Sequence, residues 1–337
     1  MALDKPLVDR YGRRVTTLRI SLTDRCNFRC VYCMPPEGVT LLPRTGFLTV
    51  SELVRFVRVA GRMGVERYRL TGGEPLLRRD IVEVVRSIRR IETVRELSIT
   101  TNGTRLGELA ADLRAAGLDR LNVSLDSLDD ARFGEVTRYP DYRRVREGIE
   151  AALATGLPVK LNVVVLKGMP ESEIIEFVRL AERRELEVRF LEFMPLCGSG
   201  WQGDLFFPIA KVREVVEGHV ELRELERNGH PAQVFAVNGG AGKVGFIAPL
   251  SEPFCETCSR IRISADGRIR PCLFSDYEVP MGHLLKNGST DGDIAGALRE
   301  AVANKPRGSK FRDDPLRDGT TDISDDAMGP FIRSIGG

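Results

Sequence analysis

The 337-residue sequence lacks a long apolar run and a marked excess of either charge. No apolar stretch is long enough to cross a bilayer, and residues 1–14 lack the apolar core of a signal peptide. The 50 basic and 48 acidic residues nearly cancel, so the charge balance does not favour a nucleic-acid partner. We therefore expect a cytoplasmic protein that binds neither membrane nor nucleic acid.

The sequence also lacks a Walker A phosphate-binding loop, and its three histidines stand outside any metal-binding or catalytic motif. Three of the seven cysteines lie within Cys26–Cys33 and three within Cys255–Cys272, whereas Cys197 stands alone. A disulfide framework is not expected without a signal peptide. Clustering of this kind is typical of metal binding instead.

Short β-branched runs alternate with amphipathic segments between Leu18 and Met194, which predicts a parallel sheet covered by helices. One helix begins with a capping box at residues 49–52, and Gly64, Gly117 and Gly156 occupy expected helix C-caps. Periodicity alone leaves two architectures open, a doubly wound sheet and a barrel of fewer than eight units. The predicted strands are Thr17–Ser21, Arg67–Thr71, Leu97–Thr101, Arg120–Leu125, Val159–Leu166 and Val188–Phe193.

The alternation fades after Pro195, and the remainder reads as β-rich. Strands are predicted at Gln233–Val237 and Lys243–Ala248. Residues Arg260–Phe274 are predicted to form a hairpin whose turn is Asp266-Gly267, a strong turn dipeptide. We therefore divide the chain into an α/β region at residues 1–200 and an α+β region at residues 201–337.

The first cysteine group, Cys26, Cys30 and Cys33, directly follows the first predicted strand, where α/β proteins place their ligand loops. A structural zinc site needs four protein ligands, and no fourth cysteine or histidine is nearby. A [4Fe–4S] cluster held by three cysteines keeps one iron free for an outside ligand. We favour such a cluster; zinc with a distant fourth ligand is the alternative.

The spacing Cys-x3-Cys-x2-Cys, with Tyr32 before the last cysteine, resembles the signature of the radical S-adenosylmethionine (SAM) superfamily. The resemblance implies that the free iron chelates SAM and that Tyr32 packs on its adenine. Thr71-Gly-Gly-Glu-Pro75 is similar to the family's glycine-rich motif, in which Gly73 would contact the methionyl amine of SAM. Ser124 and Met194 are the further SAM contacts that the resemblance implies.

The second cysteine group consists of Cys255, Cys258 and Cys272. The first two precede the predicted hairpin and the third lies on its return strand, so the turn can bring all three together. A second cluster with an open iron is favoured; a structural zinc with His283 or a solvent ligand is the alternative. Arg260 and Arg262 follow at alternate positions of a strand and should share one face.

Basic residues also occur within or at the ends of the predicted parallel strands: Arg19, Arg69, Lys160 and Arg189. Parallel strands are buried on both faces, so these charges are costly without partners. Each could lie at a strand end with its charge in water. Pointed into a common cavity, they would form a polyanion site, and a nucleoside triphosphate is its natural occupant.

Five motifs across nearly the whole chain resemble the GTP 3′,8-cyclase family of molybdenum cofactor biosynthesis: residues 18–26, 32–36, 71–75, 254–262 and the terminal Gly336-Gly337. The resemblance implies an incomplete (β/α)6 TIM-type barrel closed by the C-terminal region, with two [4Fe–4S] clusters. It also implies that a 5′-deoxyadenosyl radical from SAM takes the 3′ hydrogen of GTP. The product would be (8S)-3′,8-cyclo-7,8-dihydroguanosine 5′-triphosphate.

The same resemblance assigns the substrate contacts. The second cluster would hold guanine, the terminal glycines would reach the active site, and Arg189 is a further residue near the substrate. An external electron donor and the next pathway enzyme are implied partners, and a homodimer is a candidate assembly. A peptide-modifying radical SAM enzyme and a zinc-binding regulatory protein are the rival interpretations. The implied GTP contacts are Arg19, Arg69, Thr101, Lys160, Arg260 and Arg262.

Overall fold

The computed structural model describes residues 4–196, 203–226, 231–286 and 288–309. In these residues, strands form a single sheet in the order β12-β11-β10-β1-β2-β3-β4-β5-β6-β9-β8-β7. The six central strands are parallel and follow one another in sequence. They are β1 (Thr17–Ser21), β2 (Arg67–Thr71), β3 (Glu96–Thr101), β4 (Arg120–Ser124), β5 (Val159–Val165) and β6 (Glu187–Glu192).

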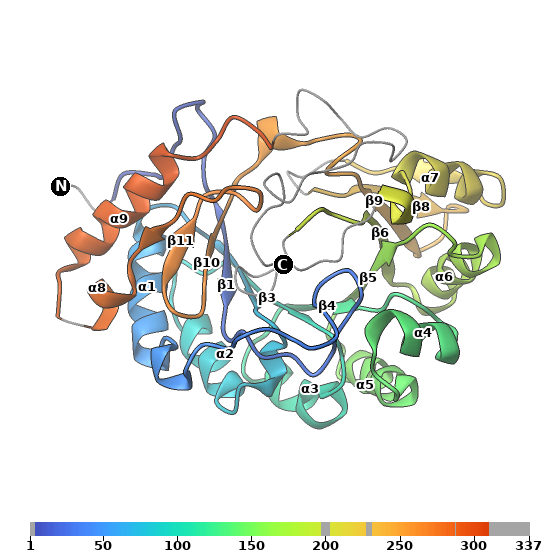
Figure 1. The fold of residues 1–337 in the computed structure, drawn as a ribbon, viewed down its shortest axis with the longest axis horizontal. Helices are drawn as coiled ribbons and strands as arrows, with labels where there is room; N and C mark the ends of the chain where they lie inside the picture. The colour runs from blue at the N-terminus through green and yellow to red at the C-terminus, as the bar shows by residue number, and fades with distance from the viewer. Residues whose placement is uncertain (1–3, 197–202, 227–230, 287, 310–337) are drawn as a thin grey trace.

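Helices connect the parallel strands and cover the outer face of the curved sheet (Figure 1). A doubly wound sheet would carry helices on both faces, so the prediction of an incomplete (β/α)6 barrel is confirmed. Alternate strand residues such as Leu18, Tyr68 and Ile99 are fully buried in the sheet–helix core. The helices are α1 (Val50–Arg62), α2 (Ile81–Arg89), α3 (Leu106–Ala115), α4 (Asp130–Thr137), α5 (Tyr142–Ala154) and α6 (Glu171–Arg184).

The C-terminal region extends both edges of the parallel sheet. At one edge β10 (Arg260–Ile263) pairs parallel with β1, followed by β11 (Arg268–Arg270) and β12 (Val279–Pro280). At the other edge β9 (Lys243–Ile247) pairs parallel with β6, followed by β8 (Gln233–Val237) and β7 (Leu222–Glu224). The division near residue 200 stays a prediction. The remaining helices are α7 (Ile209–Glu217), α8 (Gly282–Lys286) and α9 (Asp291–Ala303).

A buried carboxylate, Glu192 at the end of β6, joins the barrel to the C-terminal region. It accepts hydrogen bonds from the backbone amides of Ile209 (3.3 Å), Leu250 (2.9 Å) and Ser251 (3.1 Å), and from the hydroxyl of Ser251. A buried carboxylate is costly unless it is hydrogen-bonded in this way. Glu192 therefore fixes two C-terminal segments against the mouth of the barrel.

The local signals in the sequence appear as expected. The Thr49 hydroxyl accepts from the Glu52 amide at 3.3 Å and the Glu52 carboxylate accepts from the Thr49 amide at 2.7 Å, which completes the capping box. The hairpin turn is confirmed by the pairing of Ile263 with Ile269 and by Gly267, whose φ of +87° favours glycine. Among the helices of the described residues, none combines the length and apolarity that a bilayer span requires.

Candidate active site

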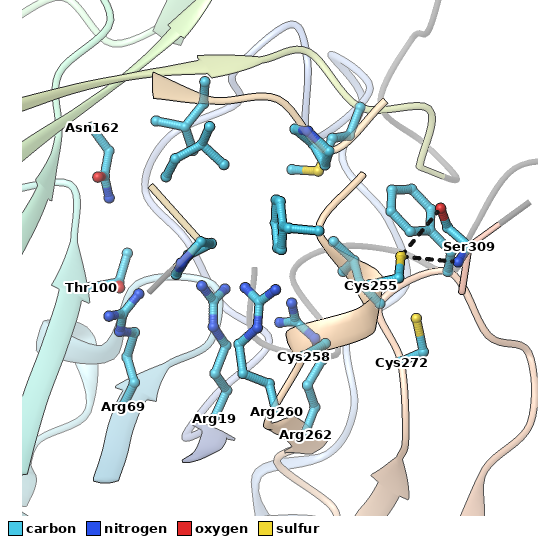
Figure 2. Close-up of a pocket in the computed structure, with 18 of the residues that line it drawn as sticks. Arg19, Arg69, Thr100, Asn162, Cys255, Cys258, Arg260, Arg262, Cys272 and Ser309 are labelled. Atoms are coloured by element: carbon cyan, nitrogen blue, oxygen red, sulfur yellow. Dashed lines mark hydrogen bonds between the residues drawn. The ribbon is translucent and has the colours of Figure 1, made fainter. Parts of the chain in front are cut away.

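The inner face of the sheet carries charged and polar side chains, because strand residues alternate between the helices and the interior. The register places Arg19 of β1 beside Arg69 of β2 on one side and Arg262 of β10 on the other. Arg260 faces the same interior, two residues before Arg262 on β10 and opposite Thr17 of β1. These four arginines line a cavity of about 210 Å³, shown in Figure 2.

The second cysteine group opens into the same cavity. Cys255, Cys258 and Cys272 lie along one wall, beside Arg260 and Arg262 (Figure 2). Cys255 begins a short 3-10 turn, η4 (Cys255–Thr257), and Cys272 follows two residues after β11, so it lies just beyond the return strand rather than on it. The hairpin nevertheless brings the three thiols together, as expected.

The four arginines form an unusually concentrated positive charge. Burial, then the charges of Arg262, Arg69 and Arg260, lower the pKa of Arg19 well below its ordinary value. Burial also lowers the pKa of Arg69 to about 9 and that of Arg262 to about 10, each further depressed by neighbouring arginines. Positive charges that destabilise one another when buried favour an anionic ligand as counter-charge.

Two of these arginines have N–H groups that are available to a ligand. Among the described residues, neither Arg19 nor Arg69 has an ion-pair partner, and the buried Nε of Arg69 has no hydrogen-bond partner. Unpaired buried donors are rare in folded proteins and indicate a position where a ligand or a water molecule binds. The site therefore suits an anion that is able to accept several hydrogen bonds at once.

The other two strand-borne bases are already paired. Lys160 Nζ donates to Glu187 Oε2 at 2.6 Å, and Arg189 Nε donates to Glu187 Oε1. Burial is the main cause that lowers the pKa of Lys160 to about 8. The strand register places Lys160 and Arg189 on the inner face of the sheet. Neither residue lines the arginine cavity, whereas Asn162, two residues after Lys160 on β5, does. Their acidic partner, Glu187, was not anticipated from the sequence.

The structure places Thr101, a predicted substrate contact, beside Glu74. Its hydroxyl donates to Glu74 Oε1 at 2.7 Å, and the residue lies outside the arginine cavity. The adjacent Thr100 lines that cavity instead, because a shift of one residue along a strand reverses the side-chain direction. Thr100 is therefore a further candidate substrate contact, and the role of Thr101 stays a prediction.

The first cysteine group lines a second cavity of about 140 Å³, together with Gly73 and Asp126. Tyr32, Ser124 and Thr100 line both cavities, so the two spaces share a wall. Three of the predicted SAM contacts, Tyr32, Gly73 and Ser124, thus lie with the first cysteines. Met194 lines the arginine cavity instead.

Tyr32 is held in the shared wall by its hydroxyl, which donates to Asp126 Oδ2 at 2.6 Å. The other oxygen of Asp126 accepts from the Val164 amide of β5 at 2.9 Å. Burial raises the pKa of Asp126 to about 6. Two successive hydrogen bonds, from Tyr32 to Asp126 and from Val164 to Asp126, therefore hold the aromatic ring against the sheet.

Each of the two cysteine groups lines one of the two cavities. Within the described ranges, no three His, Cys, Asp or Glu side chains gather closely enough to hold a single metal ion. In a [4Fe–4S] cluster each thiolate binds a different iron, so the ligands surround a space instead of a point. The assignment of the thiols to clusters therefore stays a prediction.

Two glycines shape the first cysteine loop. A Cβ on Gly72, whose φ is +147°, would lie 2.4 Å from the carbonyl oxygen of Thr23. A Cβ on Gly73 would lie 2.2 Å from the carbonyl oxygen of Arg25, next to Cys26. The backbones are hydrogen-bonded at this point, Gly73 N to Thr23 O at 2.7 Å. Glycine is required here because two main chains touch.

Comparisons with known proteins agree with this geometry. The family described as "Radical SAM superfamily" matches residues 20–181, and "Molybdenum Cofactor Synthesis C" matches residues 186–311. The GTP 3′,8-cyclase of Thermodesulfovibrio yellowstonii is 42% identical over 92% of this chain and 97% of that protein. That of Moorella thermoacetica is 43% identical over 88% of this chain and 93% of that protein. The chain belongs to the GTP 3′,8-cyclase family.

A third relative extends the family to animals. Molybdenum cofactor biosynthesis protein 1 of Bos taurus is 42% identical over 89% of this chain, which spans 48% of that longer protein. Among solved structures, Streptococcus suis SuiB bound to S-adenosylmethionine matches with a TM-score of 0.60 and 17% identity, over 86% of this chain and 69% of that one. This likeness supports the fold. Membership in the radical SAM superfamily implies a [4Fe–4S] cluster and SAM.

The structure also shows residues near the site that the sequence analysis did not identify. Lys305 is buried, lines the arginine cavity and contacts the second cysteine group. Arg13 donates to the carbonyl oxygen of Cys255 at 2.7 Å. Neither had a signal in the sequence, because both reach the site from distant segments. Cys197 and the Gly336-Gly337 pair lie outside the described residues.

We predict that Gly73→Ala disturbs the first cysteine loop. The added Cβ forces the Arg25 backbone away, at a cost of about 1–3 kcal/mol typical of overpacking. Iron content after anaerobic reconstitution and the affinity for SAM should both fall. Gly107→Ala on α3 is the control, since no atom lies within 4 Å of its Cβ. If the two variants bind iron and SAM equally well, the glycine contact has no role in shaping this loop.

Proposed function

We propose that this protein uses SAM to convert GTP into (8S)-3′,8-cyclo-7,8-dihydroguanosine 5′-triphosphate, the first step of molybdenum cofactor biosynthesis. The observation that carries the proposal is the shared wall between two cavities. One cavity holds three thiols and the glycine-rich motif, and the other holds four arginines and three more thiols. The named activity of the relatives supports the same reaction.

Cys26, Cys30 and Cys33 would hold one [4Fe–4S] cluster, and Cys255, Cys258 and Cys272 a second one. When bound, the first cluster supplies the electron that cleaves SAM into methionine and a 5′-deoxyadenosyl radical. Tyr32, Gly73 and Ser124 would orient SAM, with Met194 beside its adenine. The electron comes from an external donor in this proposal, and the next pathway enzyme and a second copy of the chain stay candidate partners.

Arg19, Arg69, Arg260 and Arg262 would bind the triphosphate. Guanidinium groups present several N–H donors in a fixed plane and suit phosphate oxygens without a phosphate-binding loop. Lys160 and Arg189, which share Glu187, would add positive charge at the amino ends of β5 and β6. Since the second thiols line the same cavity, one nucleotide is able to reach both the arginines and the second cluster.

Tyr32, Ser124 and Thr100 would bring the two ligands together. A reaction between two bound molecules is fast only when the reacting atoms are held about 3–3.5 Å apart. The shared wall allows SAM and GTP to lie next to each other, so that a radical formed from SAM meets the substrate before any other C–H bond. The link from Tyr32 through Asp126 to β5 keeps that wall in place.

Anaerobic turnover tests the proposal. The reconstituted protein, given GTP, SAM and dithionite, should form 5′-deoxyadenosine and a cyclised nucleotide that is an isomer of GTP, separated from GTP by liquid chromatography before mass spectrometry. SAM cleavage without any GTP-derived product would reject the substrate assignment. That outcome would favour the rival interpretation, a radical SAM enzyme that modifies peptides.

The cluster count gives a separate prediction. Wild-type protein should bind about eight irons, as two [4Fe–4S] clusters require. A variant with Cys255, Cys258 and Cys272 replaced by Ala should bind about half as many and lose cyclisation, because its second cluster has no ligands. Iron analysis and electron paramagnetic resonance measure this. Unchanged iron content would show that these cysteines are not cluster ligands.

A third prediction concerns the arginines. Arg69→Ala removes charge-assisted hydrogen bonds expected to contribute about 1.5–3 kcal/mol, so the Kd for GTP should rise about 10- to 150-fold. The affinity for SAM should not change, and the midpoint of thermal unfolding without GTP should stay constant or rise, since repulsion among the arginines is relieved. Arg143→Ala, on the exposed surface of α5, is the control. A lowered unfolding midpoint with equal losses of both affinities would indicate a folding defect instead.

A further inference from the structure

Lys305 is a buried lysine whose three donors are all used. It follows α9, and its Nζ donates to the carbonyl oxygens of Arg260 (2.7 Å) and Pro271 (2.8 Å) and to Cys258 Sγ (3.6 Å). A lysine ammonium has three N–H groups, and these three acceptors account for them. Lys305 therefore differs from Arg19 and Arg69, and it has no donor left to bind a substrate.

The three acceptors lie on both sides of the second cysteine group. Arg260 follows Cys258 by two residues, and Pro271 directly precedes Cys272. The Lys305 ammonium group thus links the segment that follows Cys258 to the segment that precedes Cys272. We expect this contact to help set the distance between the two thiols, because the β10–β11 hairpin is the longer covalent connection between them.

The residues after Lys305 contact the third thiol. The Ser309 amide donates to Cys255 Sγ at 3.4 Å (Figure 2). Arg13, paired with Asp9 at 2.6 Å, donates both to the carbonyl oxygen of Cys255 (2.7 Å) and to that of Arg307 (2.8 Å). Residues 305–309 therefore lie across the cysteine group and are anchored to the N-terminal segment of the chain.

We infer that Lys305 positions the ligands of the second cluster and raises its reduction potential, an inference that rests on the proposed function. A cluster held by three thiolates is anionic, and reduction adds a further negative charge. A positive charge beside Cys258 stabilises the reduced form more than the oxidised form, and a hydrogen bond to a ligand sulfur acts in the same direction. Lys305 supplies both. It is a positioning residue and does not touch the substrate.

The test compares Lys305→Met, Lys305→Arg and the surface control Lys286→Met. Lys286 bonds only to the carbonyl oxygen of Gly46 among the described residues. The reduction potentials of both clusters are measured in holoenzyme by titration followed with electron paramagnetic resonance, without SAM or GTP. In Lys305→Met the second cluster should become harder to reduce, or be lost with about half the iron, while the first cluster keeps its potential. Lys305→Arg keeps the charge and should lie closer to wild type.

Two outcomes would overturn the inference. An unchanged second potential with full iron content in Lys305→Met would show that Lys305 neither tunes nor positions the cluster. Equal shifts of both clusters, with a lowered midpoint of thermal unfolding, would show that the residue only stabilises the fold. Because neither measurement involves turnover, failure of GTP cyclisation leaves the result intact. A wild-type protein with about four irons would instead reject the second cluster itself.

Discussion

Each parallel strand of the barrel has one face in the apolar core beneath the helices and the other face toward the polar interior. One set of alternate residues packs against the helices, and the other set faces the interior cavity. Arg19 and Arg69 share their strands with Leu18 and Tyr68, which are fully buried on the other face. Each such apolar side chain contributes about 1.5–3 kcal/mol when buried. This outer core offsets the cost of holding unpaired guanidinium groups side by side, so the polyanion site depends on the strictness of the alternation.

The second constraint is long-range. β1 is the first of the six consecutive parallel strands, and its outer neighbour β10, also parallel, carries Arg260 and Arg262 into register with Thr17 and Arg19. The same hairpin carries the second cysteine group, so sheet pairing alone decides that these thiols open beside the arginines. On the far edge, β9 pairs with β6, and Glu192 fixes the adjoining loop. The C-terminal region thus completes the cavity from both edges of the barrel.

Much of this was predictable from the sequence, for physical reasons. The six parallel strands were placed to within about one residue, because β-branched runs and glycine C-caps are local signals. Arg19 and Arg69 were identified because charges within parallel strands are costly. The sequence does not single out Thr100, which lines the arginine cavity, because side-chain direction at a strand end depends on pairing that sequence alone does not reveal. Lys305 had no local signal at all, and its three acceptors are defined only by tertiary structure.

The sheet order also has a consequence for synthesis on the ribosome. β6 is complete at Glu192, whereas its neighbour β9 begins at Lys243 and β10, the neighbour of β1, begins at Arg260. A growing chain therefore carries six finished parallel strands with both outer strands unpaired, and such edges readily join other chains. For the same interval the arginine-lined face lacks the wall that β10 and the second cysteine group later supply. The order in which the chain emerges therefore leaves a period in which the protein is exposed to aggregation.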